Sequence, residues 1–106
     1  MMEVIGMSVP LVQGVISGVW SATSDEGDGR TKTELLRLWD ENTEQINALW
    51  PQIPAERFRG TLMASQWEMS VYDAILYAIE NEIHHRAQGF VYLRALDLEP
   101  PPFYER

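Results

Sequence analysis

The stretch Asn81–Gln88 has the sequence Asn-Glu-Ile-His-His-Arg-Ala-Gln and contains both histidines of the chain. It continues through Tyr92-Leu93-Arg94 and stops at the proline-rich segment Glu99–Tyr104. Imidazole, amide, carboxylate and guanidinium groups are concentrated in this one stretch. Metal or acid–base chemistry in this protein would therefore have to use it.

Helical spacing sorts these polar side chains into two groups. Residues four apart share one face of a helix, so Asn81 and His85 project together, with Gln88 beside them. His84 points toward the polar face, where Glu80 is its neighbour one turn earlier. Adjacent histidines of a regular helix cannot bind the same metal. The face of His85 also carries small residues that leave room for an ion, waters or a ligand, namely Ala74, Ala78 and Gly89.

A structural interpretation competes with a metal site. A single histidine on an apolar helix face is more often a hydrogen-bonded core residue than a ligand, and Glu80 with His84 is typical of a solvated surface pair. Arg86 is expected to pair with a carboxylate such as Glu82. Transition metals favour at least three good nitrogen, sulfur or carboxylate ligands, so one histidine and one amide form a poor site.

Composition limits the classes of protein. The chain has 106 residues, 45% of them hydrophobic, and a formal net charge of −8. We expect one domain over residues 1–106. The negative charge argues against nucleic-acid binding. The lack of cysteine is compatible with a cytoplasmic location. The apolar N-terminus lacks a basic leader and is interrupted by Pro10, Gly14 and Gly18, so we expect neither a signal peptide nor a membrane span.

The first half of the chain predicts two helices. Apolar residues recur at helical spacing from Ile5 to Val19, which favours a helix, although the many β-branched residues keep a strand as an alternative. A polar loop is predicted over Ser21–Arg30. Thr31 and Glu34 offer a capping box for a second helix, whose apolar stripe ends at Trp50 before Pro51.

The second half predicts an extended connection and one long helix. Residues 57–68 are expected to connect the elements, with Phe58, Leu62 and Trp67 packing back on the helices. Ser70 and Asp73 predict the start of a helix that runs to about Leu96. The apolar arc of this helix is wide, which is typical of a helix in the middle of a bundle.

The segment IENEIHHRAQGFVYLRALDLEPPPFY, within residues 73–104, resembles the C-terminal end of the DinB/YfiT-like family. The shared pattern is E-x-H-H-R-x-Q, then Y-L-R, then P-P-x-Y. The resemblance implies a four-helix bundle in which three histidines bind a divalent metal, often zinc or nickel. His85 matches one of the two histidines of the final helix, and Asn81 stands at the position of the other. The third would fall near Val4, where no histidine occurs. Two usual glycines are replaced, by Ala87 and Asp97.

We therefore expect an all-α, DinB-like helical bundle with three main helices. The family's first helix is expected to be missing, so that the four-helix core is completed by a second copy in a homodimer. The candidate metal ligands are His85 and, weakly, Asn81.

The function expected from the sequence is a DinB-like domain that has lost its metal site and acts as a non-catalytic dimeric scaffold, with no cofactor. One alternative is a divalent-metal enzyme using zinc, nickel or manganese, similar to the thiol-dependent transferases and hydrolase- or isomerase-like members of the family. His85 would then need help from Asn81, Glu82 or another subunit. A second alternative is a metal-free small-molecule binding module with a pocket at Ala78, Gly89 and Tyr92.

Overall fold

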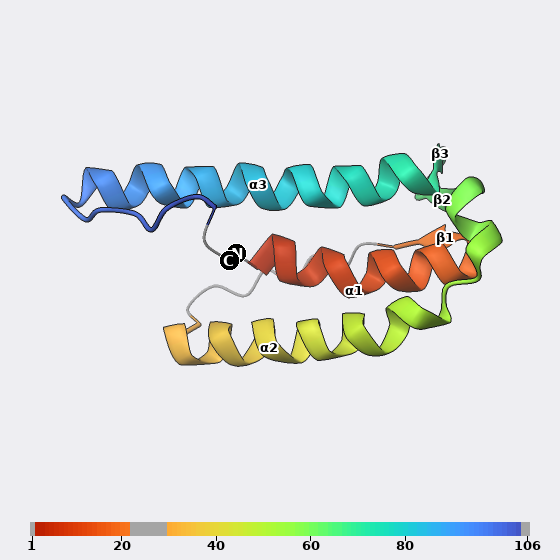
Figure 1. Ribbon diagram of the computed structural model, residues 1–106, viewed down its shortest axis with the longest axis horizontal. Helices are drawn as coiled ribbons and strands as arrows, with labels where there is room; N and C mark the ends of the chain where they lie inside the picture. The colour runs from red at the N-terminus through yellow and green to blue at the C-terminus, as the bar shows by residue number, and fades with distance from the viewer. Residues whose placement is uncertain (1, 22–29, 105–106) are drawn as a thin grey trace.

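The computed structural model describes residues 2–21 and 30–104, and these form three long helices and a small sheet (Figure 1). The long helices are α1 (Met2–Ser17), α2 (Lys32–Leu49) and α3 (Val71–Ala95). Two short 3₁₀ helices, η1 (Trp50–Gln52) and η2 (Ala55–Arg59), follow α2. The strands are β1 (Val19–Trp20), β2 (Thr61–Ala64) and β3 (Trp67–Ser70). The loop predicted over Ser21–Arg30 lies, except for its two ends, outside the described residues.

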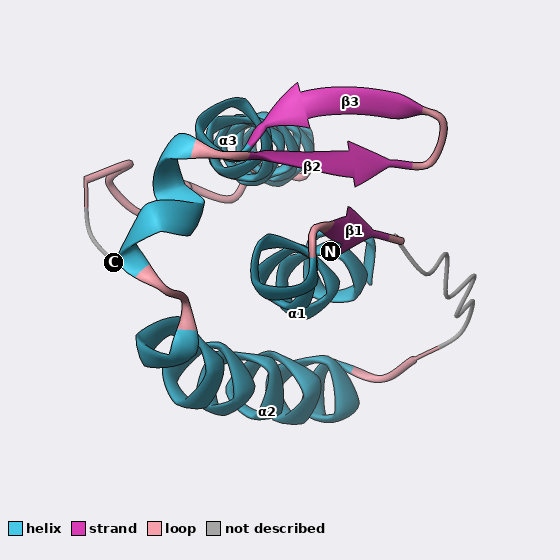
Figure 2. Cartoon of the chain, turned by 90° about the vertical axis from the view of Figure 1, so that its right-hand side faces the viewer, coloured by secondary structure: helices cyan, strands magenta, loops and turns pink. Residues whose placement is uncertain are grey.

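The first helix is the centre of the fold. Helix α1 lies between α2 and α3 and packs against both (Figures 1 and 2). It supplies most of the buried apolar side chains, and the helix predicted for this segment is confirmed. None of the helices in the described ranges combines the length and the apolar character that a membrane span requires. The buried residues of α1 are Val4, Ile5, Met7, Val9, Leu11, Val12, Gly14 and Val15.

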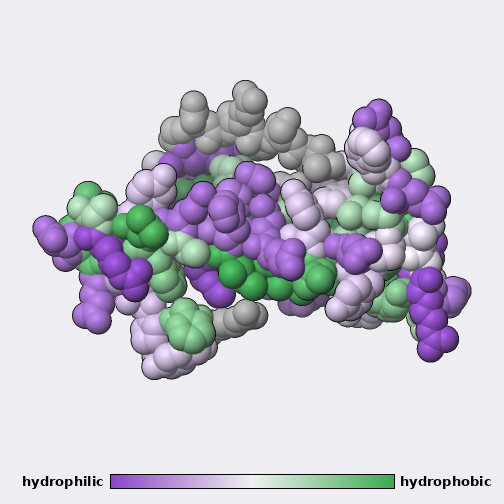
Figure 3. Space-filling view, turned by 90° about the horizontal axis from the view of Figure 1, so that it is seen from above, coloured by the Kyte–Doolittle hydropathy of each residue, from purple (hydrophilic) through white to green (hydrophobic). Residues whose placement is uncertain are grey.

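The prediction that the last helix lies in the middle of the bundle is wrong. Helix α3 buries only Val71 and Ala74, and its Leu76, Ile79 and Ile83 are 37% to 47% exposed. Figure 3, which looks down on this side of the molecule, shows apolar patches next to a largely hydrophilic surface. The apolar arc of α3 is wide enough for two neighbours, but within the described part of the chain only α1 packs along its length. The wide arc means that α3 has enough apolar surface for two neighbouring helices. In the described part of the chain, only the side of the arc toward α1 is covered.

The C-terminal end of α1 is held by contacts from the middle of the chain. Gly18, with φ of +89°, ends the helix in the left-handed conformation that favours glycine. The Arg57 guanidinium donates from Nε to the Val15 carbonyl (2.8 Å) and from Nη2 to the Thr61 carbonyl (2.9 Å). Because the last carbonyls of a helix lack partners within it, Arg57 satisfies one of them and ties α1 to the sheet.

The second helix has a strong local start and packs on α1 without burying any of its own side chains. The Thr31 hydroxyl accepts a hydrogen bond from the Glu34 amide (3.3 Å), and the Glu34 carboxylate accepts one from the Thr31 amide (2.7 Å). This confirms the predicted capping box. The structure describes every residue of α2, and none of their side chains is buried. Its apolar stripe therefore remains largely open on one side.

A three-stranded sheet corrects the all-α expectation in part. Its order is β1-β2-β3: β1 pairs with β2 in parallel, and β2 pairs with β3 in an antiparallel hairpin. The extended segment predicted before the last helix thus begins with η2 and then forms this hairpin (Figure 2). Leu62 packs into the core as expected, whereas Trp67 is 69% exposed. The two residues share a face of the hairpin, because Trp67 pairs with Ala64, two residues from Leu62. They differ in position along it: Trp67 stands at the turn end of the hairpin, whereas Leu62 pairs with Met69, close to the start of α3.

Candidate functional site

The helix that carries the candidate site begins with a side-chain cap. Ser70 Oγ accepts a hydrogen bond from the Asp73 amide (3.0 Å) and donates one to Asp73 Oδ2 (2.6 Å). The predicted cap is therefore confirmed. Helix α3 then runs without interruption through the histidine segment to Ala95. Its regular geometry places Asn81 and His85 on the face turned toward α1.

His85 lies between α3 and the first turn of α1. Its Nε2 is 3.2 Å from Glu3 Oε2, and its Nδ1 is 3.2 Å from Gln88 Oε1. The His85 side chain is 24% exposed, whereas that of Glu3 is 62% exposed. Both ring nitrogens thus face oxygen atoms, which come from two helices. A neutral imidazole can donate to only one of these oxygens, and the protonated ring can donate to both.

Gln88 connects the two histidines. Its Nε2 lies 3.1 Å from Nε2 of His84, while its Oε1 faces His85. In this orientation the amide donates to His84 and accepts from His85. The two rings meet edge to face with centroids 5.3 Å apart. We expected Glu80 beside His84, but the hydrogen bond of His84 is to Gln88. Both residues are one helical turn from His84, and it is the amide of Gln88 that makes the contact.

Asn81 lies one turn before His85 and brings an unsatisfied polar atom into the structure. Its Nδ2 is buried and has no hydrogen-bond partner among the described residues. A buried donor without a partner costs about 1–3 kcal/mol. Asn81 therefore contributes nothing to stability through this atom. In either orientation of the amide, its oxygen is only a weak ligand for a transition metal.

Glu82 is engaged elsewhere. Its Oε1 lies 3.6 Å from Nη1 of Arg86, and the two side chains are 37% and 29% exposed. The predicted Arg86–Glu82 pair is thus confirmed. Such a half-exposed pair one turn apart contributes a few tenths of a kcal/mol. As a consequence, the acid suggested as an additional ligand beside His85 already has a partner on its own helix.

The acid that does reach His85 is Glu3, which we did not single out from the sequence. Glu3 is the only acidic residue in the first turn of an otherwise apolar helix. It is also next to Val4, where the family pattern places its third ligand. The isolated acid at that position was the signal in the sequence that could have pointed to Glu3. Its role as the partner of His85 becomes clear only once α1 is packed against α3.

The donor set around His85 does not fit the divalent metal that the family resemblance implies. A separation of 3.2 Å between His85 Nε2 and Glu3 Oε2 would allow a shared ion, because two ligands about 2.1 Å from a tetrahedral metal lie roughly 3.4 Å apart. A third strong donor is lacking. Nowhere in the described ranges do three or more His, Cys, Asp or Glu side chains converge. The residues that converge are one imidazole, one carboxylate and one amide, which is a weak ligand.

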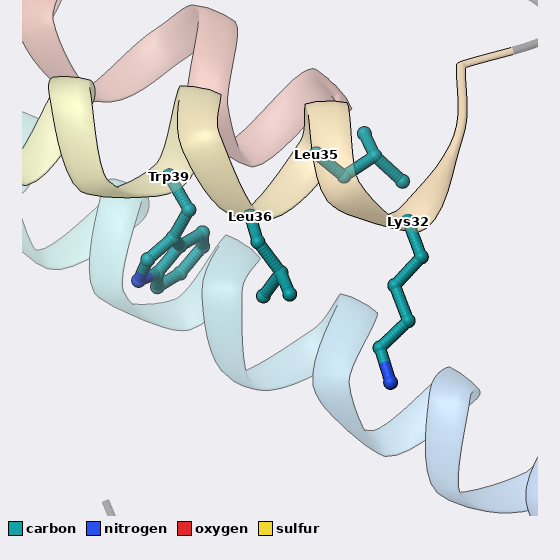
Figure 4. A pocket seen from close by; sticks show the side chains of 4 residues that line it. All are labelled: Lys32, Leu35, Leu36 and Trp39. Atoms are coloured by element: carbon teal, nitrogen blue, oxygen red, sulfur yellow. The ribbon is translucent and has the colours of Figure 1, made fainter.

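The hollow found on the surface lies away from the histidines. It has a volume of about 420 Å³ and is lined by Lys32, Leu35, Leu36 and Trp39, all from α2. Figure 4 shows Lys32, Leu36 and Trp39 projecting from the flank of α2 turned away from α1, on the side where α3 runs in this view. The pocket predicted at Ala78, Gly89 and Tyr92 is a different place.

These features define a helical-bundle domain with a β-hairpin before its last helix and an Asn81–His85 face on that helix. The sequence profile of the DinB family matches residues 30–106, which include α2, the hairpin and α3. The chain belongs to the DinB family. Helix α1, which provides Glu3, lies outside the matched residues. No curated protein matches the chain.

Proposed function

We propose that this chain is a DinB domain that has lost its metal site and serves as a non-catalytic scaffold of two copies. The observation that carries the proposal is the surroundings of His85. Its Nε2 faces a single carboxylate, that of Glu3, and a carboxamide, that of Asn81, stands at the position of the second histidine. With two strong donors, a zinc or nickel ion would keep most of its coordination sphere in water and bind weakly.

The retained side chains have a structural role in this proposal. His85 joins α3 to α1 through Glu3 and is connected along α3 to Gln88 and His84. This contact joins the two helices on which the family resemblance would place metal ligands. The fold would then persist after the metal was lost, because a hydrogen-bonded pair replaces part of the coordination that had joined the helices.

Metal analysis tests the proposal. The protein is purified without a histidine tag, equilibrated with zinc, nickel and manganese in turn, and freed of unbound ion before the metal content is measured. We expect far less than one ion per chain, and the same value for His85→Ala. The matched control is His84→Ala, which removes the neighbouring, exposed imidazole. Near-stoichiometric metal that is lost in His85→Ala but kept in His84→Ala would overturn the proposal in favour of a metal-dependent enzyme.

A restoring substitution asks whether the position of Asn81 is the cause. Asn81→His places a second imidazole one turn before His85 and provides, with Glu3, three strong donors from two helices. We expect zinc to raise the melting temperature of this variant and to leave that of the parent chain unchanged. A parent chain stabilised by zinc to the same extent would contradict the loss of the site.

A further inference from the structure

An apolar surface extends over α2, the adjoining η1 and α3. We define the apolar face by six large side chains that are 37% to 55% exposed. Single exposed apolar residues are normal on a monomer, but a group of six differs from that pattern. The residues of the apolar face are Leu36, Trp39, Trp50, Leu76, Ile79 and Ile83.

The two halves of the apolar face lie on the same side of α1. On α3, Tyr77 contacts Trp20 of β1 with ring centroids 6.1 Å apart, which identifies the flank of α3 toward the sheet. Ile79 and Ile83 are rotated to the opposite flank. On α2, Leu36 and Trp39 project away from α1, toward the side of α3 (Figure 4). Helices α2 and α3 run in opposite directions and barely meet within the described ranges, so the surface between them is open.

The size of this surface matches what a stable association requires. Six large side chains exposed to this extent leave roughly 500 Å² of apolar surface in contact with water. A standard interface buries about 800 Å² per partner, of which roughly 60% is apolar, or about 500 Å². The apolar face is thus large enough to form the centre of one interface without help from other surfaces.

The occupant we infer is a second copy of this chain, with its own apolar face docked against the first. No member of the apolar face is charged, so the same surface can be placed against itself about a two-fold axis without opposing like charges at its centre. The net charge of −8 on each copy acts at long range and opposes the approach. Screening by salt should therefore strengthen the association, the opposite of a partner held by charge.

This inference rests on the proposed function for the dimeric state and adds the surface that forms it. The test is light scattering and sedimentation of the full chain over a range of concentrations at low and high salt. We expect a dimer of the 12.2 kDa chain whose dissociation constant falls as salt rises.

Ile83→Glu should raise that dissociation constant by about 100-fold or more, because two-fold symmetry buries the new carboxylate twice. The matched control is Val91→Glu, on the same helix but outside the apolar face and 63% exposed; it should leave the constant unchanged.

A second measurement keeps the inference testable if Ile83→Glu does not fold. The chain contains no cysteine, so Leu36→Cys and Val91→Cys each introduce one unique thiol. Alkylation of the thiol at position 36 should slow as protein concentration rises, while the thiol at position 91 should react at a constant rate.

The outcomes separate the two proposals. A dimer that survives Ile83→Glu, or equal alkylation at both positions, would overturn the apolar face as the interface and leave the dimeric scaffold standing. A chain that stays monomeric at all concentrations and salts would overturn both the interface and the dimeric state. The metal analysis is unaffected by either result.

Discussion

The contact between α1 and β1 at Gly14 leads to a prediction in which two opposing effects can be weighed. A methyl group added at Gly14 would lie 2.7 Å from Cβ and 2.8 Å from Cα of Trp20. Carbon atoms pack favourably at about 3.5–4.0 Å, so β1 would have to move by roughly 1 Å. Movement is resisted because Trp20 is buried and the Gly18 carbonyl beside it accepts a hydrogen bond from the Met63 amide (2.8 Å).

The favourable effect of Gly14→Ala is helix propensity, worth about 1 kcal/mol for glycine to alanine inside a helix. The unfavourable effect is overpacking, which costs about 1–3 kcal/mol and falls at the upper end here because the colliding atoms belong to the backbone and Cβ. We therefore expect a net loss of about 1–2 kcal/mol. For a domain of this size each kcal/mol lowers the melting temperature by roughly 4–8 °C.

Gly89→Ala is the matched control. Gly89 also lies within a helix, but among the described residues nothing beyond its chain neighbours and the backbone of its own helix comes within 4 Å of a methyl group built there. Only the propensity effect remains, and we expect a gain of about 0.5–1 kcal/mol. Urea denaturation followed by circular dichroism, with all three proteins at one concentration, measures both changes. A Gly14→Ala chain as stable as Gly89→Ala would refute the close approach of α1 and β1.

Two further predictions concern Arg57 and Glu34. Arg57→Met keeps the aliphatic stem but leaves two backbone carbonyls without their charged donor, so urea denaturation should show a loss of about 2–3 kcal/mol; the exposed Arg37→Met control should lose less than about 0.5 kcal/mol, and equal losses would contradict the role of Arg57. Hydrogen bonds from the backbone and then the side chain of Thr31 hold the pKa of Glu34 below its ordinary value of 4.5. Because this pKa is depressed in the folded state, Glu34 stabilises the fold above pH 4.5 and does so progressively less as the pH falls. In thermal denaturation, Glu34→Gln should therefore be less stable than the parent at neutral pH but not in acid. A difference in stability that is independent of pH would count against the capping carboxylate.

Much of the local structure was predictable because its causes lie within a few residues. The capping boxes and caps at Thr31 and Ser70 involve partners three residues away, and both are present as expected. The shared face of Asn81 and His85 follows from helical periodicity in the same way. The family was recognisable from the histidine segment and the proline-rich stop, and the profile match agrees with it.

The site was predictable only in its local half. Asn81 and His85 come from one helix, but the carboxylate that meets His85 comes from α1, near the opposite end of the sequence. The partner of His84 was also misjudged, because Glu80 and Gln88 are equally spaced from it and only side-chain packing chooses between them. The small sheet was missed because β1 has just two residues, too few for a periodic pattern to show.

The sequence by itself determined where α2 and α3 begin, which residues share the histidine face and which family the chain belongs to. All of these depend on short-range spacing or on residue identity. Only the tertiary structure decided that α1 is the central helix, that Arg57 holds its end and that Glu3 faces His85. Those outcomes depend on which of several apolar faces find partners when distant segments meet. Two of these faces, on α2 and α3, find none in the described part of a single chain, and their exposed side chains are the surface on which we infer that a second copy docks.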